Sequence, residues 1–102
     1  MPQIVIKGVN KESVEKFCKE MINELKTATD TPENYFSVQL STNTFVFNEY
    51  PIIEIYWFER PQEIKDRFAE IVYKYFSELS DTVDIIFYKL SKESYYENNV
   101  HF

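Results

Sequence analysis

The chain has 102 residues, of which 44% are hydrophobic and 18% aromatic, so it is too apolar for a disordered segment and suits one domain. Its 17 acidic and 11 basic residues give a net charge of −6, which argues against non-specific binding to nucleic acid. One cysteine and one histidine are too few for an internal disulfide or an ordinary zinc site, and a single glycine excludes a glycine-rich phosphate loop. No apolar run approaches the ~20 residues that span a bilayer. The N-terminal MPQIVIKG has no long apolar stretch, so we expect no secretory signal and a cytoplasmic location.

The first half of the chain predicts a strand, a helix and a second strand. Residues 3–7 (QIVIK) are β-branched and apolar, as is typical of a strand. Asn10 offers a helix N-cap, and the apolar residues after it recur three and four positions apart, which predicts a helix over about 11–28. A turn at Pro32 leads into residues 35–40 (YFSVQL), the second predicted strand.

The second half repeats this order after a connecting segment. Residues 41–50 are polar and then aromatic, which indicates a loop or small hairpin with an apolar tip. A strand is predicted over 51–58, and an apolar stripe after the helix-opening Pro61 predicts a helix reaching about residue 79. Residues 83–90 (VDIIFYKL) are the last predicted strand, and the tail 91–102 has no clear period.

The two halves match each other in sequence. Pro2-x-Ile4-x-Ile6 corresponds to Pro51-x-Ile53-x-Ile55, and the apolar helix positions also match at a spacing of about 50 residues. We therefore predict a single domain over 1–102 of the α+β class. Its order is β-α-β-β-α-β, with pseudo-repeated βαβ units at about 2–40 and 51–90 forming a four-stranded mixed sheet with both helices on one face. The order alone also permits a ferredoxin-like split sheet.

The predicted strands are apolar on both faces. In 51–58 and in 83–90, both sets of alternate residues are largely apolar, whereas two helices cover only one face of a sheet. At ~25 cal/mol per Å2, leaving several such side chains in water forfeits several kcal/mol. We expect further copies of the chain to bury the second face, and a ligand cavity or a loop lid is the alternative.

A Met-Pro start, two βαβ repeats and this length resemble the tautomerase superfamily in its macrophage-migration-inhibitory-factor-like, two-repeat form. The crossover ATDTPENYFSV (28–38) is similar to that family's crossover, and WFERPQ (57–62) with YYENNVHF (95–102) resembles a small uncharacterised bacterial group within it. The resemblance implies a homotrimer whose sheets line a central barrel with the helices outside. It also implies an active site at each subunit boundary, built around an amino-terminal proline, with no metal or organic cofactor.

The resemblance makes Pro2 the candidate catalytic residue. Removal of Met1 would leave the Pro2 amine as a free base; an ordinary α-amino group has a pKa of about 7.7–8.0, and an apolar pocket or a nearby cation lowers it. Such a base suits proton transfer between carbon and oxygen, and in family members this proline catalyses keto–enol tautomerisation or, in some, hydration of unsaturated acids. If Met1 stays attached, the Pro2 nitrogen is an amide with no useful basicity.

Four charged residues are candidates for binding a small carboxylate substrate. Arg60, at the end of the third predicted strand, can grip a carboxylate bidentately, and Lys7, at the end of the first, is a second candidate. Glu54 and Asp84 could hold or supply a proton, or could pair with Lys7 or Arg60. The alternative for Arg60 is an ion pair at the helix entry, with Glu54, Glu59 or Glu63.

Other positions depart from the family pattern. Cytokine-like members have a lysine before the crossover proline, where this chain has Thr31, and a tyrosine and an asparagine in the last strand, where it has Asp84 and Ile86. Two functions therefore stay open. One is a tautomerase-like isomerase of a small keto or enol carboxylic acid that uses Pro2 as acid and base. The other is a non-catalytic oligomeric binding or structural module on the same scaffold.

Overall fold

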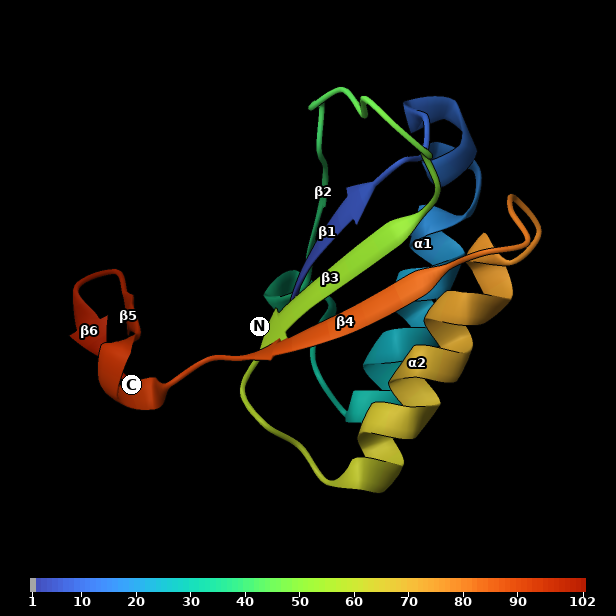
Figure 1. Cartoon of the computed structure of the whole chain (residues 1–102). Helices are drawn as coiled ribbons and strands as arrows, with labels where there is room; N and C mark the ends of the chain where they lie inside the picture. Colours follow the sequence, from blue (N-terminus) through green and yellow to red (C-terminus); the bar gives the residue numbers. More distant parts are fainter. Residues whose placement is uncertain (1) are drawn as a thin grey trace.

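Two βαβ units follow one another along residues 2–102, which this computed structural model describes (Figure 1). The β-α-β-β-α-β order and the α+β class are confirmed. The tail adds a short hairpin that the sequence analysis did not predict. In chain order the elements are β1 (Gln3–Lys7), α1 (Lys11–Thr29), η1 (Glu33–Tyr35), β2 (Ser37–Leu40), β3 (Ile52–Trp57), α2 (Gln62–Phe76), β4 (Asp84–Lys89), η2 (Lys92–Ser94), β5 (Tyr96–Glu97) and β6 (Val100–His101).

The four long strands form one mixed sheet in the order β2-β1-β3-β4. β1 and β2 are parallel neighbours, as are β3 and β4, and β1 runs antiparallel to β3 between them. Each helix therefore connects two adjacent parallel strands, and the split-sheet alternative is wrong because no strand lies between them. The repeated isoleucines meet across the central ladder, Ile4 opposite Ile55 and Ile6 opposite Ile53, and both helices cover the same face (Figure 1).

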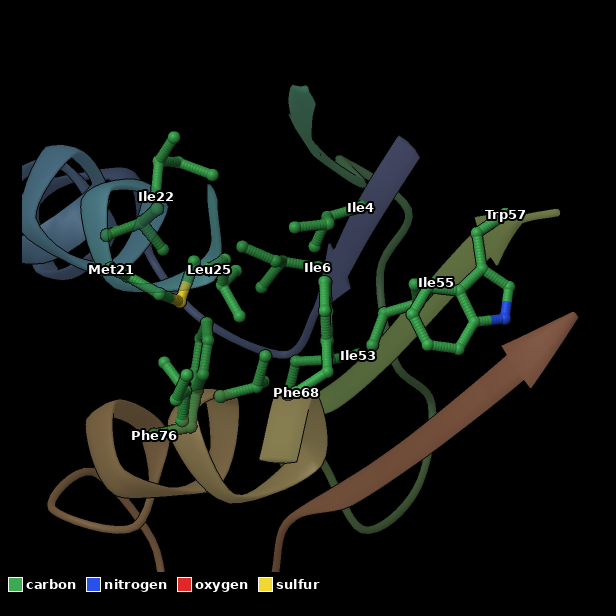
Figure 2. Close-up of a cluster of buried hydrophobic side chains, with 13 residues drawn as sticks. Ile4, Ile6, Met21, Ile22, Leu25, Ile53, Ile55, Trp57, Phe68 and Phe76 are labelled. Atoms are coloured by element: carbon green, nitrogen blue, oxygen red, sulfur yellow. The ribbon is translucent and has the colours of Figure 1, made fainter. Parts of the chain in front are cut away.

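The core lies between this face and the two helices (Figure 2). Alternate residues of β1 and β3 point into it and are at most 2% exposed, which is the period-two pattern of a half-buried strand. The helices contribute one apolar stripe each. The buried apolar helix residues are Val14, Met21, Ile22, Leu25, Phe68, Ile71, Val72 and Phe76.

Local signals set the ends of the helices. The Asn10 side chain accepts a hydrogen bond from the Ser13 amide at 2.8 Å, so the predicted N-cap of α1 is present. The predicted extension of the second helix to residue 79 is wrong: α2 ends at Phe76, and a turn in which the Leu79 amide bonds the Phe76 carbonyl follows. This turn carries Leu79 off the buried stripe and leaves its side chain 43% exposed.

The second face of the sheet, here called the open face, has no helix over it. It carries apolar side chains that are only partly covered, and Ile86 and Tyr88 are 39% and 41% exposed. Polar residues interrupt it, so this face is less uniformly apolar than predicted. Its residues, in register across the sheet, are Gln3, Val5, Lys7, Ser37, Gln39, Ile52, Glu54, Tyr56, Asp84, Ile86 and Tyr88.

Two segments extend from this framework. The tail projects from the end of β4 (Figure 1), and Phe58 contacts it through the rings of Tyr95 and Phe102, at centroid distances of 5.1 and 5.3 Å. The segment 41–50 is a loop whose tip exposes Val46 and Phe47. Among the described residues, neither helix is long and apolar enough to cross a bilayer.

We expect Gly8→Ala to lower the free energy of unfolding by roughly 1–3 kcal/mol. Gly8 has φ +76°, and a Cβ added there would lie 2.2 Å from the Tyr50 carbonyl oxygen, so the substitution meets both backbone strain and a clash. Urea unfolding measures the loss, with Lys11→Ala on the exposed start of α1 as control. Equal stability of the two variants would contradict the close approach at Gly8.

Candidate functional site

Pro2 lies at the end of the sheet where β1 and β2 begin and β3 ends. Its side chain is fully buried, and its carbonyl accepts a hydrogen bond from the Ser37 amide at 3.3 Å. Because Gln3 pairs with Tyr56 in the antiparallel ladder, Pro2 lies opposite Trp57, on the helix-covered face. The predicted removal of Met1 concerns a residue outside the described ones.

Arg60 reaches the same end of the sheet from the turn between β3 and α2. Its guanidinium donates to the Thr31 hydroxyl and to the Phe58 carbonyl, each at 3.3 Å, and lies 5.1 Å from the centroid of the Trp57 ring. Burial lowers the pKa of Arg60, yet an arginine at such a site keeps its proton. Thr31 occupies the position where cytokine-like members of the resembled family have a lysine. Through its bond to Thr31, the guanidinium of Arg60 therefore brings a positive charge to that position from the turn between β3 and α2.

Arg60 has no carboxylate within ion-pair distance among residues 2–102. Glu54 pairs with Lys7 instead, at 3.1 Å, and Glu59 pairs with Lys89, at 2.9 Å. The helix-entry ion pair considered for Arg60 is thus wrong. The guanidinium is held by a hydroxyl, a carbonyl and a ring, so its positive charge is not neutralised within the described chain.

Lys7 and Glu54 meet on the open face. Lys7 Nζ donates to Glu54 Oε2, and the Tyr56 hydroxyl donates to Glu54 Oε1 at 3.2 Å, so both carboxylate oxygens are occupied. The Tyr56 ring stacks on Tyr88 at a centroid distance of 4.8 Å. The hydrogen bond to Glu54, together with its charge, raises the pKa of Lys7, while burial and then Glu54 raise the pKa of Tyr56.

Asp84 begins β4 at the opposite end of the sheet from Pro2. One of its carboxylate oxygens accepts from the Tyr50 hydroxyl at 2.8 Å, and this hydrogen bond, followed by the charge of Asp84, raises the pKa of Tyr50. Lys7 ends the five-residue β1, about 17 Å from Pro2 at ~3.3 Å per residue. Within one copy, the structure therefore brings Arg60 to the end where Pro2 lies, and places Lys7, Glu54 and Asp84 on the other face.

The sequence analysis missed Trp57 and Tyr50 as neighbours of these candidates. The alternating pattern of β3 marks Trp57 only as a core residue, and nothing in it indicates that the ring also supports Arg60. Tyr50 lies in a segment without period, and its bond to Asp84 joins residues 34 apart in sequence. Within residues 2–102, no three His, Cys, Asp or Glu side chains gather in an arrangement that could hold a metal ion.

Solved structures with the same fold belong to the tautomerase superfamily. Macrophage migration inhibitory factor from Oncomelania hupensis is 16% identical, with a TM-score of 0.77, covering 100% of this chain and 83% of that chain. An R7 fused 4-OT wild-type asymmetric trimer is 9% identical, with a TM-score of 0.75, covering 98% of this chain and 94% of that chain. At these identities the similarity concerns the fold. The predicted resemblance to the superfamily is confirmed at that level.

A closer relative comes from the bacterial group that the sequence resembled. The crystal structure of a domain of unknown function (DUF1904) from Sebaldella termitidis is 31% identical, covers 100% of both chains and has a TM-score of 0.91. No curated protein matches the sequence. The family model "Domain of unknown function (DUF1904)" matches residues 1–101. On this match, the chain belongs to the DUF1904 family, which has the fold of the tautomerase superfamily.

Proposed function

We propose that this chain is a tautomerase-like isomerase of a small keto or enol carboxylic acid, with Pro2 as acid and base and Arg60 as the carboxylate-binding residue. The observation that carries the proposal is the hydrogen bond from Arg60 to Thr31. It brings a cation without a carboxylate partner in the described chain to the crossover position where cytokine-like members of the resembled family have a lysine. That position is at the end of the sheet where Pro2 opens β1.

The chemistry follows from the surroundings of the two residues. With Met1 removed, the buried ring of Pro2 disfavours its ammonium form, and the positive charge of Arg60 acts in the same direction, so both lower the pKa of the amine. Such a base takes a proton from carbon and returns it to oxygen. Arg60 offers more N–H donors than its bonds to Thr31 and Phe58 use, and these bonds fix its direction before a carboxylate arrives.

Self-association is part of the proposal. The open face leaves Ile86 and Tyr88 partly in water, and a homotrimer would bury it against two further copies. The 4-OT relative is a trimer by its own description. In an assembly with sites at subunit boundaries, Lys7, Glu54 and Asp84 of one copy face its neighbours, and we propose them as the residues that a second copy adds to substrate binding.

A non-catalytic module is the second candidate function. Two observations favour it. Pro2 is fully buried at the start of a strand, and Asp84, at the position where cytokine-like members have a tyrosine, is already bonded to Tyr50. In that case the scaffold would act as a stable oligomer that binds a partner or small ligand, and Met1 would remain on most molecules in the native host.

The test is a tautomerisation assay with phenylpyruvate and 2-hydroxymuconate, on protein whose intact mass shows that Met1 is absent. We expect Pro2→Ala to lower kcat/KM by about 10²- to 10⁴-fold, the usual contribution of a positioned acid–base group. Arg60→Gln should act mainly on KM, raising it about 10-fold or more, because it removes a bidentate carboxylate contact.

The chain provides a matched control, since its other arginine is Arg67. Arg67 lies on the exposed side of α2, 4.0 Å from Glu70, so Arg67→Gln removes the same charge away from the site and should leave both constants unchanged. A rate equal to that of buffer, or full activity in Pro2→Ala, would remove Pro2 from this role. Retention of Met1 in protein from the native host would favour the non-catalytic module.

A further inference from the structure

Positive charge gathers in a small pocket between the end of β3, the start of α2 and the end of β4, here called the β3–α2 pocket. Its volume is about 70 Å3, and Trp57 and Phe87 contribute the aromatic part of its lining. Three cations line it, Arg60, Lys65 and Lys89. This concentration stands out in a chain whose net charge is −6.

Two of these cations are held by aromatic rings rather than by carboxylates. Lys65 Nζ lies 5.3 Å from the centroid of Phe87, as Arg60 lies over Trp57. Among residues 2–102, neither cation has a carboxylate within ion-pair distance. The rings of Trp57 and Phe87 therefore hold the two cations at the β3–α2 pocket without neutralising their charges.

One carboxylate, Glu59, lines the pocket, and it pairs with Lys89. Both side chains of this pair are more than two-thirds exposed, and such surface pairs are weak because water and salt screen them. Lys89, through its hydrogen bond and charge, and more weakly Lys65 keep the pKa of Glu59 below its usual value. Glu59 is therefore ionised near neutral pH, and the pocket retains a surplus of two positive charges.

We propose that the β3–α2 pocket binds a phosphoryl group with two negative charges, either inorganic phosphate or the phosphate end of a small phosphomonoester. The two negative charges of such a group would balance the surplus of two positive charges in the pocket. The volume is well below the ~300–1,000 Å3 of ordinary small-molecule pockets, which suits one compact oxyanion better than two carboxylates separated by a carbon chain. The cations come from three separate parts of the chain, the β3–α2 turn, α2 and β4.

This binding can be tested apart from the isomerase activity, because Pro2 does not line the pocket and the binding needs no free amine. The two proposals share Arg60, so the test uses only the lysines and Glu59. Inorganic phosphate and glycerol phosphate are titrated into the full chain at constant ionic strength, with chloride as the comparison anion. Chemical-shift changes of backbone amides locate the ligand.

We expect saturable binding of phosphate and glycerol phosphate, with the largest shifts in residues 59–65 and 87–89 and none of comparable size with chloride. Whichever of the two binds more tightly identifies the source of the phosphoryl group. Lys65→Gln and Lys89→Gln should each weaken binding about 10-fold, the range for a charge-assisted hydrogen bond. Glu59→Gln should strengthen it several-fold, because it removes the competing carboxylate.

The control is Lys11→Gln, which removes one positive charge at the start of α1, near the end of the sheet where β1 ends and β3 begins, whereas the pocket lies where β3 ends. It should leave the affinity within about twofold of the unmodified chain, since exposed charges at opposite ends of the sheet are screened over a Debye length. An equal loss in Lys11→Gln would show attraction by general charge only and would overturn the proposal. So would unchanged affinity in both pocket lysine variants, or shifts with chloride as large as those with phosphate.

Discussion

If the protein self-associates through its open face, as we propose, replacing Ile86 with aspartate should convert it into monomers. Ile86 lies at the centre of β4 on the open face, opposite Glu54 in the β3–β4 ladder, and its side chain is 39% exposed in one copy. If further copies cover this face, an aspartate there loses water on association and has a glutamate beside it. Burying an unpaired charge costs several kcal/mol, so the dissociation constant should rise by about 100-fold or more.

Sedimentation velocity over a range of concentrations measures this effect. Tyr73→Asp is a suitable control, because Tyr73 is 52% exposed on α2, away from the open face, and should leave the assembly intact. If the site lies at a subunit boundary, Ile86→Asp should also lose activity while its far-ultraviolet circular dichroism stays unchanged. A monomeric unmodified chain at every concentration would contradict the assembly and, with it, the boundary site.

Much of the fold could be predicted because the spacing of apolar residues indicates each helix and strand from its own segment of sequence. The match between the two halves of the chain then indicates how the strands pair. The pairing of Ile4 with Ile55 and of Ile6 with Ile53 across β1 and β3 follows from two similar βαβ units related by an approximate twofold. The hairpin in the tail was missed because its strands have only two residues each. Its signal was the dipeptide Asn98-Asn99, where φ is 52° and 64°, since asparagine tolerates the left-handed conformation that a two-residue hairpin turn requires.

The candidate site was harder to predict because strand direction is a property of the sheet. Lys7 is the last residue of β1 and Arg60 follows β3, and the sequence alone does not reveal that these strands run antiparallel, with their C-terminal ends at opposite ends of the sheet. The bond from Arg60 to Thr31 joins residues 29 apart, and its support by Trp57 depends on a ring that the pattern assigns to the core. Side-chain constellations of this kind depend on tertiary packing, which periodicity does not encode.

Phe68→Ala should give the largest loss of stability in this chain. Phe68 is completely buried, and its ring packs edge-on against Trp57 and Phe87 at centroid distances of 5.2 and 5.8 Å. Removing it takes away the transfer free energy of the ring and leaves a cavity beneath β3 and β4, which together cost about 3–5 kcal/mol. That is a large share of the ~5–15 kcal/mol of a typical domain.

The same substitution links the core to the candidate site. Trp57 supports Arg60 and, with Phe87, lines the β3–α2 pocket, so a cavity behind both rings should loosen the guanidinium as well as the fold. Phe68→Leu, which keeps most of the volume, should cost about 1 kcal/mol and stay folded, and its KM or phosphate affinity reports on the site separately from stability. Urea unfolding at neutral pH compares both variants with Tyr73→Ala on the exposed side of α2, expected within about 0.5 kcal/mol of the unmodified chain. If Phe68→Ala cost no more than that control, the ring would not be the support of Trp57 and Phe87, and the position of Arg60 would need another cause.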